Sequence, residues 1–441
     1  MRLIEGRLGL SRYGMLCVWL LLPAFLACGT AAPAAAETLP DALAEAATHN
    51  AAILAQQSRV QAVGEAIAIG EAGYFPTVSI AGSASLGALP NPGSGAVLDG
   101  LALDQRSLAY SVTVEQPIFD GFKTYHAVAA AKANAAAERN DLAGLTQNVL
   151  VEAVSAFVDV IRSRTIVHLR EQNVANLDHE LAATRQRSVK GDASEIDIQQ
   201  TSARLADAAD ALAAADADGA SAGARFQMVI GHPPGQLQAP KLPAAALPGS
   251  LTDAFALGQS ANPGLLSALQ REDAARHDIG NATSAVLPKV VLDAQYERTY
   301  VQAGRPLTND QNFSIVGRVA VPLFDGGAAL ARVRQAKHLH AARLQMIAEQ
   351  RAAVASTIAA AWAQLASARK RTTLNAKAVQ AHRAALNGLR QARRGGQRTT
   401  LEVLDGERDL IEAEVRQQQS KRDLIVAGYT LLAVTGQLQA Q

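Results

Sequence analysis

Two acidic residues near the end of the chain, Glu402 and Asp405, lie three positions apart in a stretch of helix-forming composition. On a helix this spacing places both carboxylates on one face. Such a pair could attract cations, and it could equally belong to an ordinary solvated face. His338 and His340 lie two positions apart. A helix points them to different sides, so they cannot easily share a metal ion, and we expect them to be solvated.

No motif of nucleophilic or nucleotide chemistry occurs in the sequence. It contains no Gly-x-Ser-x-Gly, no P-loop and no Gly-x-Gly-x-x-Gly. The whole chain has a formal net charge of +1, and residues 1–36 hold three Arg and one Glu (+2), so the remainder is near −1. This balance does not favour nucleic-acid binding. We expect a protein that is not an enzyme and that has no cofactor and no metal.

The N-terminus is typical of a bacterial secretory signal. Arginines precede an apolar run at 13–27, and the Ala-Ala-Ala at 34–36 fits a cleavage site. The apolar run is too short for a transmembrane helix. The alternative is a lipobox at 25–28, in which Cys28 would be lipidated. Both cysteines, Cys17 and Cys28, lie in this segment, so cleavage after residue 36 leaves no thiol in the mature chain.

The chain repeats itself after roughly 200 residues. Pro-Ile-Phe-Asp-Gly at 117–121 matches Pro-Leu-Phe-Asp-Gly at 322–326, an offset of 205, and Gly191 matches Gly396 at the same offset. A stretch with five prolines lies between the copies and is predicted to be a linker. The predicted organisation is a signal peptide at 1–36, a first repeat at 37–231, a linker at 232–249 and a second repeat at 250–441.

Each copy contains two segments in which apolar and polar residues alternate, as in strands with one apolar face. The predicted strands are Thr77–Leu86, Ser107–Phe119, Lys289–Tyr300 and Asn312–Val321. A length of about ten residues suits a tilted strand that crosses a bilayer, although an ordinary soluble sheet would show the same alternation. Aromatic residues gather at the predicted strand ends, as in a membrane girdle: Tyr74, Phe75, Phe119, Tyr300, Phe313 and Phe324.

The rest of each copy is predicted to be helical. Segments 123–190 and 328–394 contain no proline, and apolar residues recur every seven positions in both, which indicates a coiled-coil seam. A helix of this length is a rod of roughly 100 Å. Shorter helical stretches are predicted at 39–73, 194–230, 250–286 and 398–435. We expect each long helix to lie antiparallel to two short ones stacked end to end.

Four strands cannot close a barrel, and open sheet edges cannot face lipid. If the strands cross a membrane, two or three chains must therefore associate. The helices would then continue the tube into the periplasm.

With this combination of repeats, strands and long helices, the chain resembles the TolC-like outer-membrane factor family. The resemblance covers residues 37–441 and rests on the duplicated plan, on the two Pro-x-Phe-Asp-Gly junctions and on the run Gly-Gly-Gln-Arg-Thr-Thr-Leu-Glu-Val-Leu-Asp at 395–405. It implies a mixed α and transmembrane β fold. A homotrimer would form a twelve-stranded barrel in outer-membrane lipid, continued by a periplasmic coiled-coil tunnel of twelve helices. It also implies a periplasmic adaptor (membrane fusion protein) and an inner-membrane pump as partners.

The resemblance assigns roles to residues near the helix tips. Gly191 and Gly396 would form hairpin tips that contact the adaptor, and a plain turn is the simpler role of either. Glu402 and Asp405 match the family's acidic constriction and would form a carboxylate ring at the pore entrance.

The resemblance also implies a gate. Asp197 and Arg398 match the family's gate-closing ion pair between neighbouring helix pairs. Arg393 stands where a relative in the family carries a tyrosine, so the closed-state contact could be altered there.

Residues 401–405 and the C-terminal segment resemble the type I protein-export branch more than the multidrug branch. The expected function is export through an inner-membrane ABC transporter of a large protein such as a haemolysin or adenylate-cyclase-type toxin. Multidrug efflux with an RND-type pump is the first alternative. A soluble periplasmic coiled-coil adaptor is the second, although it would lack four strands of bilayer length.

Overall fold

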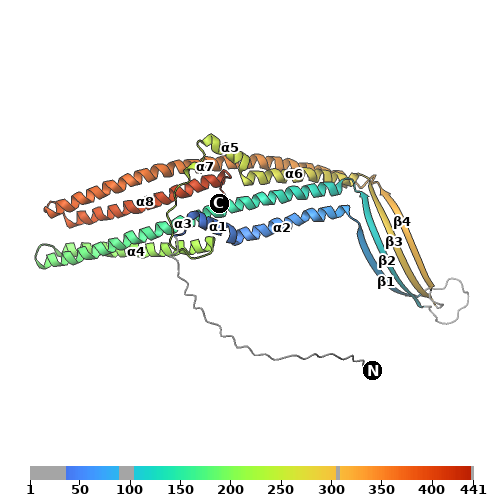
Figure 1. Cartoon of the computed structure of the whole chain (residues 1–441), viewed down its shortest axis with the longest axis horizontal. Coiled ribbons are helices and arrows are strands. Elements are labelled where there is room, and N and C mark those ends of the chain that lie inside the picture. Colours follow the sequence, from blue (N-terminus) through green and yellow to red (C-terminus); the bar gives the residue numbers. More distant parts are fainter. Residues whose placement is uncertain (1–35, 89–103, 304–307, 439–441) are drawn as a thin grey trace, which may run out of the picture.

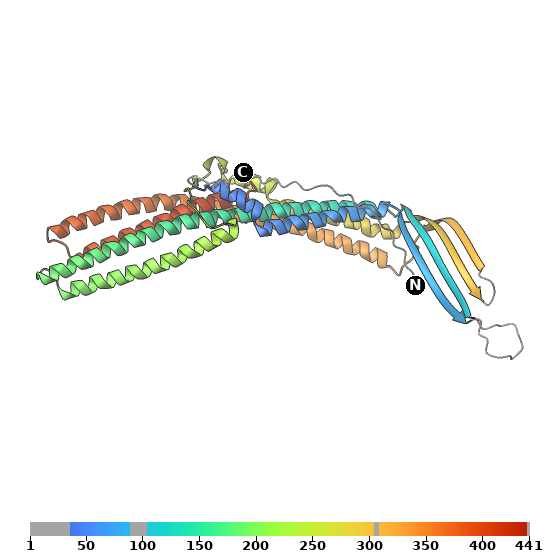
Figure 2. The ribbon, with the colours of Figure 1, turned by 60° about the horizontal axis from the view of Figure 1, so that its bottom comes forward.

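The computed structural model describes residues 36–88, 104–303 and 308–438. The predicted signal peptide, apart from Ala36, lies outside the described residues, as do both cysteines. The described chain is elongated, with helices along most of its length and one β-sheet at one end (Figure 1). The sheet leans away from the helices (Figure 2).

The same order of elements occurs twice. The first half forms α1 (Leu39–His49), α2 (Ala51–Glu71), β1 (Thr77–Ala88), β2 (Asp104–Phe119), α3 (Lys123–Val189) and α4 (Glu195–Ile230). The second half forms α5 (Leu251–Ala261), α6 (Pro263–Thr283), β3 (Lys289–Ala303), β4 (Thr308–Ala320), α7 (Ala328–Arg394) and α8 (Thr400–Val434). Short 3₁₀ helices occupy Ala72–Tyr74, Ala244–Ala246 and Ser284–Val286.

The helical stretches predicted at 39–73 and 250–286 are each divided in two. Asn50 ends α1 and Asn262 ends α5, both with extended backbone, at ψ 123° and 120°. The side chain of Asn50 accepts a hydrogen bond from the amide of Ala52, and Asn262 accepts one from Leu265. Asparagine favours this capping position over the helix interior, and this preference breaks both stretches.

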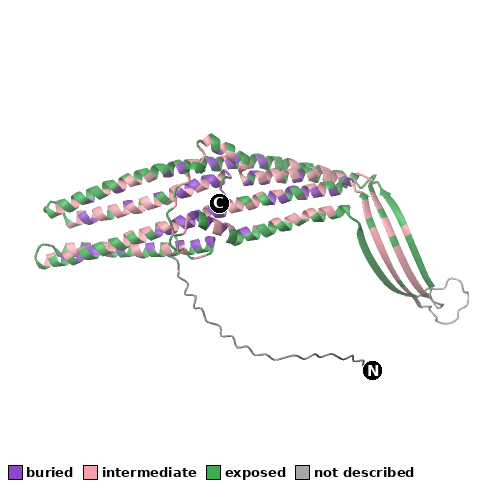
Figure 3. Cartoon of the chain, viewed as in Figure 1, coloured by how far each residue is buried: buried purple, intermediate pink, exposed green. Residues whose placement is uncertain are grey.

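The two long helices carry the predicted seam. α3 and α7 have 67 residues each. α3 contacts α2 and α4, and α7 contacts α6 and α8, so each long helix is flanked by shorter ones along its length (Figure 1). The seven-residue positions are largely buried (Figure 3): Ala153, Val160, Leu181, Ile358, Leu365, Val379 and Leu386 are buried, and Val167, Val174 and Thr372 are partly buried.

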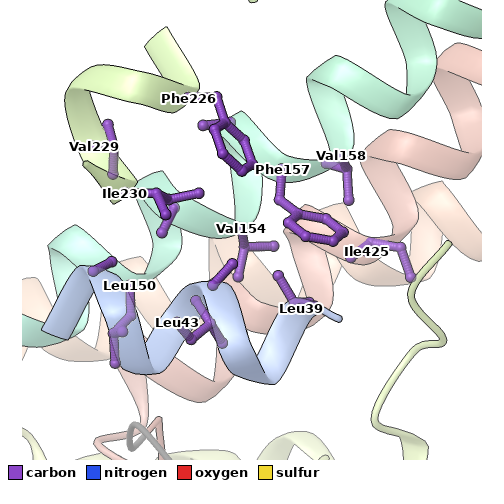
Figure 4. Close-up of a cluster of buried hydrophobic side chains, with 14 of the residues drawn as sticks. Leu39, Leu43, Leu150, Val154, Phe157, Val158, Phe226, Val229, Ile230 and Ile425 are labelled. Carbon is purple, nitrogen blue, oxygen red and sulfur yellow. The ribbon is translucent and has the colours of Figure 1, made fainter. Parts of the chain in front are cut away.

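The largest buried cluster of the described residues combines side chains from both repeats (Figure 4). Phe157 of α3 and Phe226 of α4 are both fully buried, with ring centroids 6.2 Å apart, and Leu39 of α1 and Ile425 of α8 pack beside them. An 18-residue window of α3 is apolar enough to cross a membrane, with a mean hydropathy of 1.3, but 56% of it is buried within the chain. Helix packing therefore accounts for its apolar composition.

The four strands form one antiparallel sheet in the order β1-β2-β3-β4. Residues paired in register share a face, so the pairing Ile80–Val112–Tyr296–Phe313 defines one face and Ser79–Thr113–Gln295–Ser314 the other. We call these the apolar face and the polar face. The apolar face carries Val78, Ile80, Leu108, Tyr110, Val112, Val114, Leu292, Tyr296, Phe313, Ile315 and Val319, and the polar face carries Ser79, Ser83, Ser111, Thr113, Glu115, Asp293, Gln295, Glu297, Asn312, Ser314 and Arg318.

Neither outer strand has a partner on its far side within the described chain, because β1 and β4 form the two ends of the sheet. The apolar side chains of these strands are exposed: Ile80 is 77% exposed and Phe313 67%. A single chain thus leaves two open edges and an uncovered apolar face, both of which require another surface.

Candidate functional site

The α3–α4 hairpin and the α7–α8 hairpin each end in a turn of the same type, at the end of the molecule far from the sheet (Figure 1). After α3, Gly191 has φ +82°, and its amide donates to the carbonyl of Ser188 while the amide of Asp192 donates to Arg187. After α7, Gly396 has φ +72° and repeats the pattern. This is the Schellman arrangement, in which a left-handed residue ends a helix and glycine is strongly preferred. The expectation that Gly191 and Gly396 form the turns at the hairpin tips is confirmed.

A capping box begins the return helix of each hairpin. Ser194 precedes α4, and the Asp197 carboxylate accepts hydrogen bonds from its amide (2.9 Å) and hydroxyl (2.8 Å). Thr399 precedes α8, and the Glu402 carboxylate accepts from its amide (2.8 Å) and hydroxyl (3.1 Å). The two boxes are 205 residues apart. Asp197 and Glu402 therefore both stabilise a helix start, whatever else they do.

The same contacts hold both acids in the charged form. Hydrogen bonds from Ser194 lower the pKa of Asp197. The amide of Thr399, followed by the Arg398 guanidinium and the Thr399 hydroxyl, lowers the pKa of Glu402. Donors that favour the ionised form have this effect. Both carboxylates are thus negative at neutral pH.

The predicted gate residues do not contact each other within the described part of this chain. Arg398 donates to Glu402 at 2.7 Å, and the Asp197 carboxylate accepts a hydrogen bond from the Ser194 hydroxyl at 2.8 Å. A contact between Asp197 and Arg398 would have to form between neighbouring hairpins of an assembly, and it stays a prediction.

Asp405 faces the other hairpin, because the apolar side of α8 packs there. Leu404 is buried with Leu177 of α3 and Ala208 of α4. The next residue, Asp405, accepts a hydrogen bond from Arg204 of α4 at 2.8 Å. The carboxylate of Asp405 is thus partly neutralised within the protomer.

Arg393 takes part in a second link between the hairpins. It donates to Glu180 of α3 at 2.8 Å, and Arg187 donates to the same carboxylate oxygen at 2.8 Å. Further from the tips, Arg170 of α3 donates to Glu412 of α8 at 2.8 Å. Near the middle of the helices, Arg422 of α8 also donates to Asp159 of α3 at 3.1 Å, so arginine–carboxylate contacts join the two hairpins from the tips to the middle of their length.

The sequence contained a signal for the caps but none for these links. Ser-x-x-Asp at 194–197 and Thr-x-x-Glu at 399–402 are capping-box patterns. Arg204 and Glu180 lie 201 and 213 residues from their partners, so only the packed structure identifies them.

His338 and His340 do not share a site. His338 is exposed, as expected. The expectation for His340 was wrong, because it contacts Glu272 of α6 at 2.6 Å and its side chain is 21% exposed. Packing of α7 on α6 covers this position. Within the described ranges, no group of three or more metal-ligating side chains could hold an ion.

Comparison with known proteins identifies the fold. The model of the outer membrane efflux protein family matches residues 42–232 and 258–437. The chain belongs to this family. Its members are channel proteins, and this chain is accordingly a TolC-like protein of the outer membrane whose helices lie in the periplasm. The soluble-adaptor alternative has no support from the match.

Characterised relatives extend over most of the chain. Outer membrane efflux protein BepC of Brucella suis is 33% identical over 413 residues, 93% of this chain and 88% of that protein. Alkaline protease secretion protein AprF of Pseudomonas aeruginosa is 23% identical and covers 76% of this chain and 71% of its own length. The Campylobacter jejuni CmeC outer membrane channel has the same fold, with a TM-score of 0.80 at 14% identity over 90% of this chain and 85% of CmeC.

Proposed function

We propose that the protein is a homotrimeric export duct. Three sheets would close a twelve-stranded barrel, with the apolar face toward lipid and the polar face toward a water-filled lumen. The observation that carries this proposal is the single sheet with two open edges and two chemically distinct faces. Unpaired backbone groups cannot remain in hydrocarbon, and four strands are too few to close alone.

The helices would continue the duct as a periplasmic tunnel of twelve helices. Glu402 and Asp405 would stand at its entrance as a ring of six carboxylates, and the tip glycines Gly191 and Gly396 would meet the periplasmic adaptor. We take residues 1–36 as a signal peptide and 37–231 and 250–441 as repeats joined by the linker 232–249. Processing after residue 36 would deliver the mature chain to the periplasm.

We propose type I protein secretion as the pathway, with a membrane fusion protein as adaptor and an ABC transporter as pump. The resemblance of residues 401–405 to the protein-export branch supports this proposal, as does the similarity to a protein named for alkaline protease secretion. The cargo would be a large secreted protein such as a haemolysin or adenylate-cyclase-type toxin.

Efflux of small molecules with an RND-type pump is the second candidate. It is favoured by the 33% identity to BepC, which is named as an efflux protein. Both candidates use the same duct, since a channel conducts what its pump delivers.

Deletion of the gene, with complementation, separates the two. Loss of one large protein from the culture medium, with unchanged sensitivity to dyes and detergents, supports protein secretion. Increased sensitivity with an unchanged set of secreted proteins supports efflux and contradicts type I secretion.

A further inference from the structure

The apolar face of the sheet carries arginine near the end that lies away from the helices. Arg298 of β3 is in register with Tyr110 of β2 and Gln311 of β4. One row closer to the helices, Tyr296 is paired with Phe313, and one row further out Tyr300 is paired with Asn309. On β3 and β4, this face thus changes from apolar to polar at the row of Arg298.

Arg298 is held by neutral and aromatic neighbours. Its Nε donates to Asn309 Oδ1 at 3.0 Å, and its guanidinium carbon lies 5.1 Å from the centroid of the Tyr300 ring. The Tyr110 ring lies 6.5 Å from both Tyr300 and Tyr296. Among the side chains that the structure describes, no carboxylate pairs with Arg298. The neighbours that the structure describes orient the guanidinium without neutralising its charge.

A second arginine and a hollow lie beside this cluster. Arg106 of β2 is exposed and is in register with Leu86 of β1, on the same face. A hollow of about 550 Å³ is lined by Leu86, Arg106, Leu108 and Tyr300, together with the small residues Ala84, Ser85 and Ser107. Apolar walls next to two cationic groups suit an amphiphilic molecule with an anionic head.

The depth of Arg298 agrees with the level of lipid headgroups. We take Val290, the first residue of β3 on the apolar face, as the lower edge of the band. Arg298 lies about 26 Å beyond it along β3, at roughly 3.3 Å per residue. With a strand tilt of about 40°, this is roughly 20 Å along the membrane normal, close to the top of an apolar band about 25 Å tall. An arginine at the middle of that band would be costly, whereas one at its boundary can reach a phosphate.

We propose that Arg298 and Arg106, with Tyr110 and Tyr300, bind the phosphate of a phosphorylated glycolipid of the outer leaflet, of the lipid A type. Guanidinium binds phosphate through paired hydrogen bonds, and the hollow would take part of an acyl chain. This proposal rests on the proposed barrel, because only the barrel turns the apolar face of the sheet toward lipid.

Native mass spectrometry of the full-length protein, extracted in mild detergent and delipidated, tests the site. The probes are bis-phosphorylated lipid A, dephosphorylated lipid A and inorganic phosphate. The wild type should retain bis-phosphorylated lipid A, and Arg298→Gln should bind it about tenfold more weakly, as expected when a charge-assisted contact is lost. Arg106→Gln is an independent second variant and should also weaken binding. Arg318→Gln is the matched control, because Arg318 lies on the polar face, and it should bind as the wild type does.

Equal retention by Arg298→Gln, Arg106→Gln and the wild type would overturn the proposal. Equal binding of dephosphorylated lipid A would overturn it too, as would binding of inorganic phosphate without lipid. Lipid is counted on whichever oligomer carries the chain, so the same spectra report trimer formation separately and the two proposals fail independently.

Discussion

Arg204 of α4 donates to Asp405 of α8 at 2.8 Å and so ties the returning helices of the two hairpins to each other. Arg393 and Glu180 tie the outgoing helices at the same distance. If the protein is a duct, these contacts lie where it would have to widen, and one of them uses an acid of the predicted pore ring. A change that breaks the contact between Arg204 and Asp405 would therefore alter both the charge at the pore entrance and the attachment of one hairpin to the other.

Arg204→Gln should increase the cation preference of the pore, because it removes the nearer of the two arginines that pair with Asp405 and leaves only Arg408, at 4.0 Å. We expect a change in the permeability ratio on the order of twofold, larger at low salt, where screening is weak. Glu402→Ala with Asp405→Ala should act in the opposite direction and abolish block by trivalent cations. The measurement is the reversal potential in planar bilayers under a salt gradient.

Arg383→Gln is the matched control, because Arg383 pairs with Glu414 within one hairpin at 2.6 Å. It should leave selectivity unchanged. Identical reversal potentials for wild type, Arg204→Gln and the double alanine variant would show that neither acid sets selectivity. Glu402 would then serve only as a helix cap, and Asp405 only as a surface residue.

Acidification should remove the cation preference only at low pH. The folded-state pKa of Glu402 lies below its usual value because Thr399 and Arg398 favour the carboxylate. A lowered pKa means that the charge, and the stability that its contacts contribute, is present above the unfolded pKa of about 4 and lost as the pH falls through the folded value. In reversal potentials measured from pH 6 to pH 3, the preference should therefore be lost at a lower pH than an unperturbed glutamate, with a pKa of about 4.3, would produce. Loss of the preference already near pH 6 would contradict this assignment.

The predicted gate pair should be separable from the cap in which Asp197 takes part. Asp197→Asn removes the charge and keeps an acceptor for Ser194, whereas Ser194→Ala keeps the charge and removes a capping hydroxyl, at a cost of about 1 kcal/mol. An exposed ion pair contributes about 0–1 kcal/mol. Three additive copies would bias the closed state by up to about 3 kcal/mol, a factor of up to about 150. Asp197→Asn and Arg398→Ser should therefore raise resting conductance, and Ser194→Ala should not.

Closed-level conductance in both charge variants would exclude this pair as the lock. Arg393 would then be the residue to change. Arg393→Gln releases α7 from Glu180, whereas Arg390→Gln breaks a contact with Glu407 inside one hairpin (2.7 Å) and serves as its control.

Gly396→Ala should weaken adaptor binding without preventing assembly. Gly396 has φ +72°, where a Cβ costs about 1–2 kcal/mol, and open space surrounds the site of the added methyl group. The neighbouring Gly395 has φ −85°, which alanine adopts readily, so Gly395→Ala is the control. Crosslinking to the adaptor in cells should fall in the first variant and persist in the second. Equal crosslinking in both would show that the tip shape is not what the adaptor recognises.

Local patterns predicted much of the fold. The seven-residue spacing through Ile358 and Leu365 placed the seam, and the long helices begin and end within a residue of the expected positions. Alternation placed the four strands, although each of them extends beyond the prediction at the end that leads into its hairpin loop. The break at Asn50 was not predicted, because one capping side chain outweighs good helix composition on both sides.

The site was less predictable than the fold. The spacing of Glu402 and Asp405 predicted that both lie on one helix, but it did not predict which side chains contact them. Glu402 turns back to Thr399, a contact that the Thr-x-x-Glu pattern could have indicated. Asp405 turns to Arg204, and this contact depends on how Leu404 packs between the hairpins. Ion pairs between distant segments follow from packing and leave no local pattern in the sequence.

The proposed duct requires three copies of this chain in the outer membrane. Its most direct test is the native mass of the protein extracted in mild detergent from isolated outer membranes. We expect a single species of three mature chains, because only association can pair the open edges of β1 and β4. A stable monomer, or recovery of the protein in the soluble periplasmic fraction, would contradict it.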